Sequence, residues 1–207
     1  MSEIVTVIPT RGFIFADTLI SLHNNGIYNP IIVKGLPIPD AQNECVKQAL
    51  EEYSSYVLFI EDDMSFPEEI LGKMMKMDEA IVAVDYPMDN GYSTIARQGT
   101  EILWCGLGCT LVKRGVLAAM KENWFDTSYS WRLTENPFKL ERIDNPNKYG
   151  GHDINFCIKA REMGFKIVAL PGVEAKHMRC KNINKSLYNN GQMEIYPLEP
   201  ISKRQQY

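Results

Sequence analysis

The sequence lacks any apolar run long enough to cross a membrane as a helix. Such a helix needs about 20 consecutive apolar residues, and every apolar run here is far shorter. The N-terminus carries Glu3 and soon reaches Pro9, so it lacks the basic segment and the apolar segment of a secretory signal. We therefore expect a protein of the cytoplasm, or of the host cytoplasm if the source is viral.

The cysteines lack a metal-binding pattern. The chain has five cysteines, an odd number, and they are scattered along it. Cys105 and Cys109 are separated by three residues, but there is no second such pair to complete a zinc site. The simplest expectation is free, buried or half-buried thiols in a reducing compartment.

An excess of positive charge is also missing. The net charge of −4 argues against a protein devoted to nucleic acid. The distribution is uneven, because residues 176–207 carry six basic side chains and two acidic ones. This tail, with Arg179 and Lys181 among its basic residues, could contact a phosphate-bearing donor or acceptor, or it could be a solvated tail.

The first half of the chain alternates strand and helix patterns. Strands are expected at residues 4–8, 30–33, 56–60 and 80–84, and helices at 13–23, 41–53 and 68–77. This order is typical of a mostly parallel central sheet flanked by helices. The length of 207 residues fits a single domain, so the sequence predicts one α/β domain.

The second half is less regular. Strands are expected at residues 101–104, 109–113 and 165–170, and helices at 115–122 and 153–163. Residues 123–150 are rich in aromatics, Asn and Pro and have little periodicity, which favours a long functional loop.

The strongest local signal is the acidic triplet Glu61, Asp62 and Asp63, which directly follows the apolar strand YVLFI. Three adjacent carboxylates repel one another, and each resists removal from water. Ligands bind at the strand ends of open α/β sheets, and a divalent cation such as Mg²⁺ or Mn²⁺ would relieve the repulsion. The alternative is a solvated acidic turn that caps the helix beginning near Pro67.

Three further positions each allow two interpretations. Asp153 follows a Gly-Gly pair at a helix start, where it is either an N-cap or a general base. His177 is either a packing or surface residue or a metal ligand. Gly106 and Gly108 either line a sugar site or form a tight hairpin between two strands.

Taken in order, these segments resemble the GT-A glycosyltransferase fold, and in particular small members similar to family 2, some of them phage-encoded. The resemblance runs from VTVIPTRG (residues 5–12) to His177. It implies a GT-A-like (Rossmann-like) domain over residues 1–207. Residues 1–100 would form the nucleotide-binding half, 101–180 the acceptor and catalytic half, and 181–207 a C-terminal tail.

The resemblance also implies roles for individual residues. Glu61-x-Asp63 stands in place of the family's Asp-x-Asp motif, which makes Asp63 the first metal ligand, assisted by Glu61 and His177. Asp153 maps to the catalytic base, although His152 stands where the family has Glu. The nucleotide-sugar site is implied at Thr10, Arg11, Asp40, Asn43, Asp62, Gly106 and Gly108. The acceptor side is expected to include Trp104, Trp131 and His152.

The expected function is a metal-dependent transfer, with inversion, from a nucleotide-sugar donor to an acceptor hydroxyl. A UDP-sugar is the favoured donor, and Mn²⁺ or Mg²⁺ the cofactor. The acceptor is open, with nucleic acid and glycans among the choices. The alternatives are a metal-dependent nucleotide-sugar hydrolase or nucleotidyltransferase, and a non-catalytic nucleotide-sugar-binding module. A nucleotidyltransferase usually has a Gly-rich loop after its first strand, whereas this chain has Gly12 alone there.

Overall fold

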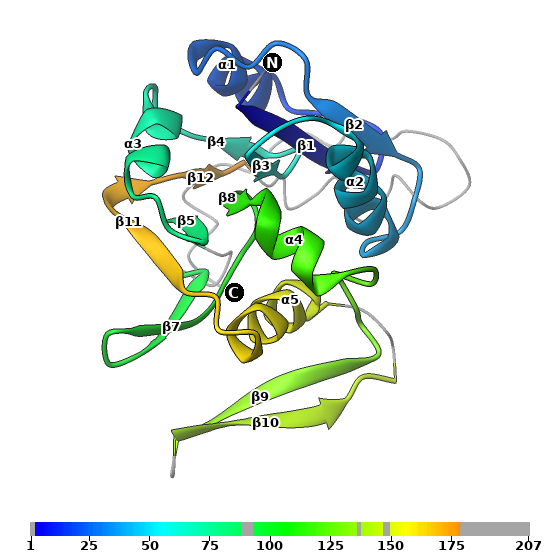
Figure 1. Ribbon diagram of the computed structural model, residues 1–207, viewed down its shortest axis with the longest axis vertical. Coiled ribbons are helices and arrows are strands. Elements are labelled where there is room, and N and C mark those ends of the chain that lie inside the picture. The colour runs from blue at the N-terminus through cyan, green and yellow to red at the C-terminus, as the bar shows by residue number, and fades with distance from the viewer. Residues whose placement is uncertain (1–2, 88–92, 136–137, 147–149, 179–207) are drawn as a thin grey trace, which may run out of the picture. The chain divides into compact units, whose positions relative to one another are not determined.

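The computed structural model describes residues 3–87, 93–135, 138–146 and 150–178 (Figure 1). The chain divides into two units, residues 1–177 and 178–207, and every helix and strand reported below belongs to the first. The helices are α1 (Ala16–Asn24), α2 (Asp40–Glu51), α3 (Ile70–Lys76), α4 (Arg114–Met120) and α5 (His152–Glu162). The strands are β1 (Ile4–Thr10), β2 (Ile31–Lys34), β3 (Tyr56–Ile60), β4 (Met64–Ser65), β5 (Ile81–Asp85), β6 (Ile95–Gln98), β7 (Glu101–Cys105), β8 (Cys109–Lys113), β9 (Tyr129–Glu135), β10 (Phe138–Asp144), β11 (Ile167–Glu174) and β12 (Lys176–His177).

Six strands form the central sheet, in the order β11-β5-β8-β3-β1-β2. The pairs β1–β2, β1–β3 and β5–β11 are parallel, whereas β8 runs antiparallel to both β3 and β5. The sheet is therefore mixed but mostly parallel, and helices cover it. The expected α/β, GT-A-like (Rossmann-like) fold class is confirmed.

Two hydrophobic clusters lie on the two faces of this sheet, because successive side chains of a strand point in opposite directions. Val57 and Phe59 of β3 belong to one cluster, together with residues of α2, α4 and α5. Leu58 and Ile60 belong to the other, which contains residues of α1 and α3. The continuous apolar run of β3 thus reflects a strand that is buried on both faces.

The remaining strands form three two-stranded ribbons: β4–β12, β6–β7 and β9–β10. The expectation of a long loop over residues 123–150 is wrong, since β9 and β10 pair along their whole length, from Tyr129↔Asp144 to Glu135↔Phe138. The sequences of β9 and β10 mix charged and apolar residues. A strand outside the central sheet needs no regular apolar pattern, so the sequence did not indicate these two strands. The tight-hairpin interpretation of Gly106 and Gly108 is also wrong, because β7 pairs with β6 and β8 joins the central sheet.

Two element boundaries differ from the sequence expectation. The helix expected from residue 68 begins at Ile70, because Glu69 has a left-handed backbone with φ of 60°. Strand β11 continues through Pro171 and Gly172 to Glu174, with an irregular register against β5. Among the described residues, no helix is both long and apolar enough to span a membrane.

The larger cluster is centred on three phenylalanine rings. Phe125 stacks on Phe156 with ring centroids 5.1 Å apart, and Phe59 meets Phe125 edge-on at 5.9 Å. All three side chains are almost fully buried. We predict that Phe59→Ala lowers the free energy of unfolding by about 3–5 kcal/mol, because it removes apolar burial and leaves a cavity.

Urea denaturation measures this loss. Tyr53→Ala is the control, since that side chain is 86% exposed and its removal should change stability by less than about 0.5 kcal/mol. Equal effects of the two substitutions would contradict the packing described for β3.

Candidate active site

The acidic turn after β3 is held by its backbone. The amide N–H of Glu61 donates to the carbonyl of Gly108 (3.1 Å), and the carbonyl of Asp62 accepts from the Phe15 amide (2.8 Å) and the Thr18 hydroxyl (3.0 Å). The three acidic side chains are half-buried. None of them caps α3, whose N-cap is Glu69 without a side-chain cap bond, so the helix-capping alternative is wrong.

His177 reaches this turn through a short ribbon. Strand β12 pairs antiparallel with β4, which sets His177 opposite Met64, the residue after Asp63. The imidazole Nε2 lies 3.0 Å from Asp63 Oδ1 and 3.6 Å from Glu61 Oε2, and the His177 side chain is only 6% exposed. A residue more than 110 positions along the chain thereby joins the two carboxylates.

These three side chains meet the requirements of a divalent-cation site. One ligand atom from each of Glu61, Asp63 and His177 lies within 4.8 Å of the others. Two hard carboxylate oxygens and one imidazole nitrogen suit Mn²⁺ and are compatible with Mg²⁺. The negative charge of two close carboxylates favours a cation between them.

The Asp62 side chain interacts with residues at the end of β1. Burial raises the pKa of its carboxyl, as does the charge of Asp63, while the Thr10 hydroxyl and the backbone N–H of Arg11 act in the opposite direction. Thr10 is buried and its hydroxyl donates to the carbonyl of Phe13 (2.8 Å), whereas Arg11 is exposed. Thr10, Arg11 and Asp62 therefore form a second group beside the carboxylate–imidazole cluster.

Asp153 lies in the first turn of α5, but it does not cap the helix. The N-cap residue is Gly151, with φ of 76° and no side-chain cap bond. The Asp153 carboxylate instead accepts from Leu107 N (3.4 Å) and from Gln42 Nε2 (3.5 Å), and His152 Nε2 lies 3.2 Å away. The N-cap interpretation is therefore wrong. The Asp153 side chain is 22% exposed, and this partly accessible carboxylate faces the loop between β7 and β8.

Helix α2 contributes one residue to the site in addition to the two that were expected, whose nucleotide-binding role stays a prediction. Asp40 is exposed at the helix start, and the Asn43 side-chain amide bonds both the N–H (3.0 Å) and the C=O (2.9 Å) of Phe125. Gln42 is the side chain that reaches Asp153, and it is 2% exposed. The signal was present in the sequence, because Gln42 occupies the same helical face as the apolar residues Cys45 and Ala49.

The glycines between β7 and β8 are required by a tyrosine that the sequence analysis missed. The N–H of Gly108 donates to the hydroxyl of Tyr86 (3.1 Å). A Cβ at Gly108 would lie 2.7 Å from that hydroxyl, and one at Gly106 would overlap it. Tyr86 therefore occupies the space beside both Cα atoms, and the expectation that Gly106 and Gly108 line a nucleotide-sugar site stays a prediction for the backbone of this loop.

The expected acceptor-side residues, Trp104, Trp131 and His152, lie on three different elements, β7, β9 and α5. Trp131 of β9 donates from Nε1 to Asn155 Oδ1 (2.6 Å), which docks the β9–β10 ribbon on α5. The amide of the buried Asn155 donates in turn to the carbonyls of Asp126 (2.6 Å) and Tyr129 (2.9 Å). Trp104 packs against the core beside β6, and Arg179 and Lys181 lie outside the described residues.

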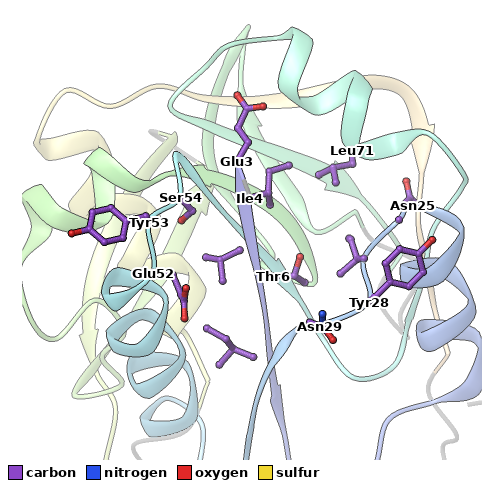
Figure 2. A pocket seen from close by; sticks show the side chains of 14 residues that line it. Glu3, Ile4, Thr6, Asn25, Tyr28, Asn29, Glu52, Tyr53, Ser54 and Leu71 are labelled. Carbon is purple, nitrogen blue, oxygen red and sulfur yellow. The ribbon is translucent and has the colours of Figure 1, made fainter. Parts of the chain in front are cut away.

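A cavity of about 640 Å³ lies at the other end of the strands. Its lining includes Glu3, Ile4 and Thr6 of the β1 start, with Tyr28 and Tyr53 beside them (Figure 2). The acidic turn follows the carboxyl end of β3, whereas Tyr53 precedes its amino end. The cavity contains none of the expected site residues, so it is not this site.

Searches by sequence and by structure gave different results. No protein-family model and no curated protein matches this sequence. Solved structures do match. The protein A197 from STIV has a TM-score of 0.65 and 18% identity over 86% of both chains.

Two other solved structures that match are enzymes or enzyme-like proteins of nucleotide-sugar chemistry by name. GalNAc-T7, solved with UDP, GalNAc and Mn²⁺, has a TM-score of 0.58 and 9% identity over 86% of this chain and 44% of its own. A protein from Bacillus anthracis described as a glucose-1-phosphate thymidylyltransferase, in complex with a sucrose, has a TM-score of 0.51 and 10% identity over 86% and 89%. At these identities, the likeness establishes the shared fold.

The contact between Tyr86 and the glycine loop gives a direct prediction. Gly106→Ala and Gly108→Ala should each lower the free energy of unfolding by about 1–3 kcal/mol, because the new methyl group forces Tyr86 to move. Thermal or urea unfolding measures the effect.

Gly72→Ala is the matched control. Gly72 is an exposed residue of α3 with no atom within 4 Å of an added Cβ, so alanine there should leave stability unchanged or raise it by up to about 1 kcal/mol. A destabilisation of all three variants by the same amount would contradict the close packing.

Proposed function

We propose that this chain is a metal-dependent glycosyltransferase that moves a sugar from a nucleotide-sugar donor, with a UDP-sugar favoured, to an acceptor hydroxyl. The observation that carries the proposal is the grouping of Glu61, Asp63 and His177 at the carboxyl end of β3. In a GT-A-like sheet this edge is where ligands bind. The likeness in fold to GalNAc-T7, solved with UDP, GalNAc and Mn²⁺, supports the same reading.

Glu61, Asp63 and His177 would hold the cation, and Asp63 is its first ligand. Bound there, Mn²⁺ or Mg²⁺ would supply Lewis-acid stabilisation for the negative charge on the leaving nucleoside diphosphate. The protein would hold the three donor atoms together before the cation binds. For His177, the pairing of β12 with β4 does this. The low exposure of that imidazole limits competition from water.

The nucleotide is assigned to the carboxyl end of β1. Thr10, Arg11 and Asp62 lie there, and Asp40 is exposed at the start of α2. Arg11 offers a positive charge to the phosphates, and carboxylates accept hydrogen bonds from ribose hydroxyls. Gly106 and Gly108 would serve through the backbone of their loop.

Asp153 is assigned as the general base. Its carboxylate would take the proton from the acceptor hydroxyl as that oxygen attacks the anomeric carbon, while the bond to the diphosphate breaks. A single displacement of this kind inverts the anomeric configuration. Leu107 N–H and Gln42 hold the carboxylate in place. We assign His152, which lies 3.2 Å from this carboxylate, and Trp131, which bonds Asn155 of the same helix, to the acceptor side.

One observation favours a second candidate. The thymidylyltransferase-like structure shares the fold over nearly the whole of both chains, and the same cation site would serve nucleotidyl transfer or donor hydrolysis. The products separate these activities: pyrophosphate marks nucleotidyl transfer, and free sugar without a glycoside marks hydrolysis.

The test is Mn²⁺-dependent release of nucleoside diphosphate from a panel of UDP-, GDP- and TDP-sugars. We expect one donor class to be consumed by the wild type, with loss of activity on addition of EDTA or in Asp63→Ala. Asp153→Asn should still bind Mn²⁺ and donor but should transfer about 10²–10⁴-fold more slowly, because only the base is removed.

Glu52→Gln is the matched control for a lost carboxylate, since Glu52 lines the distant cavity, and it should behave as wild type. Absence of turnover and of any Mn²⁺-dependent nucleotide binding would refute the transferase. Mn²⁺-dependent donor binding without turnover would identify a binding module.

A further inference from the structure

Tyr86 is a buried polar residue to which the proposed mechanism assigns no role. It follows β5 directly and is 4% exposed. Its backbone is fixed by Thr94, whose hydroxyl donates to the Tyr86 carbonyl (3.1 Å) and whose amide donates to the same oxygen (3.2 Å). The carbonyl of Thr94 then accepts from the N–H of Gly106 (2.9 Å).

The loop from Gly106 to Gly108 connects the two chemical groups of the site. Its three amides donate to the Thr94 carbonyl, the Asp153 carboxylate and the Tyr86 hydroxyl, in that order along the chain. The carbonyl of Gly108 accepts from the Glu61 amide (3.1 Å). The three-residue loop therefore connects the cation ligand Glu61 with the assigned base Asp153. Tyr86 holds both ends of the loop, Gly106 through Thr94 and Gly108 through its own hydroxyl.

The tyrosine ring makes a separate contact. It lies edge-on to the His177 imidazole, with centroids 5.6 Å apart and an interplanar angle of 65°. The hydroxyl end of the Tyr86 side chain packs against the loop from Gly106 to Gly108. The packing is so close that a Cβ at either glycine would meet the tyrosine. One side chain thus contacts the imidazole of the cation cluster through its ring and the loop of the base through its hydroxyl.

We propose that Tyr86 is a positioning residue that sets Asp153 and the Glu61–Asp63–His177 cluster relative to each other. The inference rests on the proposed function and adds a residue to it. The ring orients His177, and outer-shell contacts of this kind tune cation affinity. The hydroxyl holds Gly108 in place. It thereby also holds the adjacent amide of Leu107, which donates to Asp153.

Tyr86 acts in this way without exchanging protons. Burial raises the pKa of its hydroxyl well above the usual value, and the charges of Glu61 and Asp153 add to the effect. In the proposed role, this hydroxyl has no proton to transfer. It therefore serves as a fixed hydrogen-bonding group.

Two substitutions separate the ring from the hydroxyl. Tyr86→Phe keeps the ring against His177, so we expect the Mn²⁺ dissociation constant to stay within twofold of wild type while kcat falls about tenfold. Tyr86→Leu removes both contacts, so we expect kcat to fall further and the Mn²⁺ dissociation constant to rise about 10–100-fold. Tyr56→Phe is the control, because it removes a hydroxyl that bonds the distant Asp78.

The readouts are Mn²⁺ titration, donor turnover, and amide hydrogen exchange of the metal-free protein followed by NMR. Exchange at Gly108 and Leu107 should accelerate at least tenfold in Tyr86→Phe and not in Tyr56→Phe. An unchanged kcat in Tyr86→Phe, or an unchanged Mn²⁺ affinity in Tyr86→Leu, overturns the proposal. If the wild type neither binds Mn²⁺ nor consumes a donor, the proposed function fails, and the exchange rates alone decide whether Tyr86 holds the loop.

Discussion

The site depends on one close packing contact, that between Tyr86 and the two glycines that connect β7 to β8. Because Gly106 and Gly108 have no Cβ, the tyrosine fits between that loop and the imidazole of His177. The loop amides are then free to bond three different partners, among them the Asp153 carboxylate. A larger residue at either position would separate elements that the rest of the site needs together.

The sheet topology explains how residues far apart in the sequence meet at this contact. Strands β1 and β3 are parallel neighbours, so their carboxyl ends place Thr10 and the acidic turn at one edge. The antiparallel strand β8 begins at that edge, which brings the glycine loop to Glu61. Helix α5, which precedes β11 in the chain, brings Asp153 to this contact. The β4–β12 ribbon, whose second strand follows β11, brings His177.

The sequence was sufficient for the alternating first half, because the β-branched run at residues 4–8 and the apolar run YVLFI are typical of buried strands. It also pointed to Glu61, Asp63, His177 and Asp153, whose residue types carry chemistry in themselves; the structure groups the first three, and their roles stay predictions. Tyr86 was missed because its importance comes from tertiary contacts, whereas Gln42 left a signal in the sequence, a polar residue on the apolar face of α2. The ribbon β9–β10 was missed because a strand outside the core needs no apolar pattern.

The proposed function requires a cation between Glu61, Asp63 and His177, next to a nucleotide. Crystals grown with Mn²⁺ and UDP and measured at the manganese absorption edge would locate both. We expect one anomalous peak in contact with Asp63 and His177, with the diphosphate of UDP against it. A peak elsewhere, or UDP bound in the cavity beside Tyr28 and Tyr53 with no metal at the acidic turn, would contradict it.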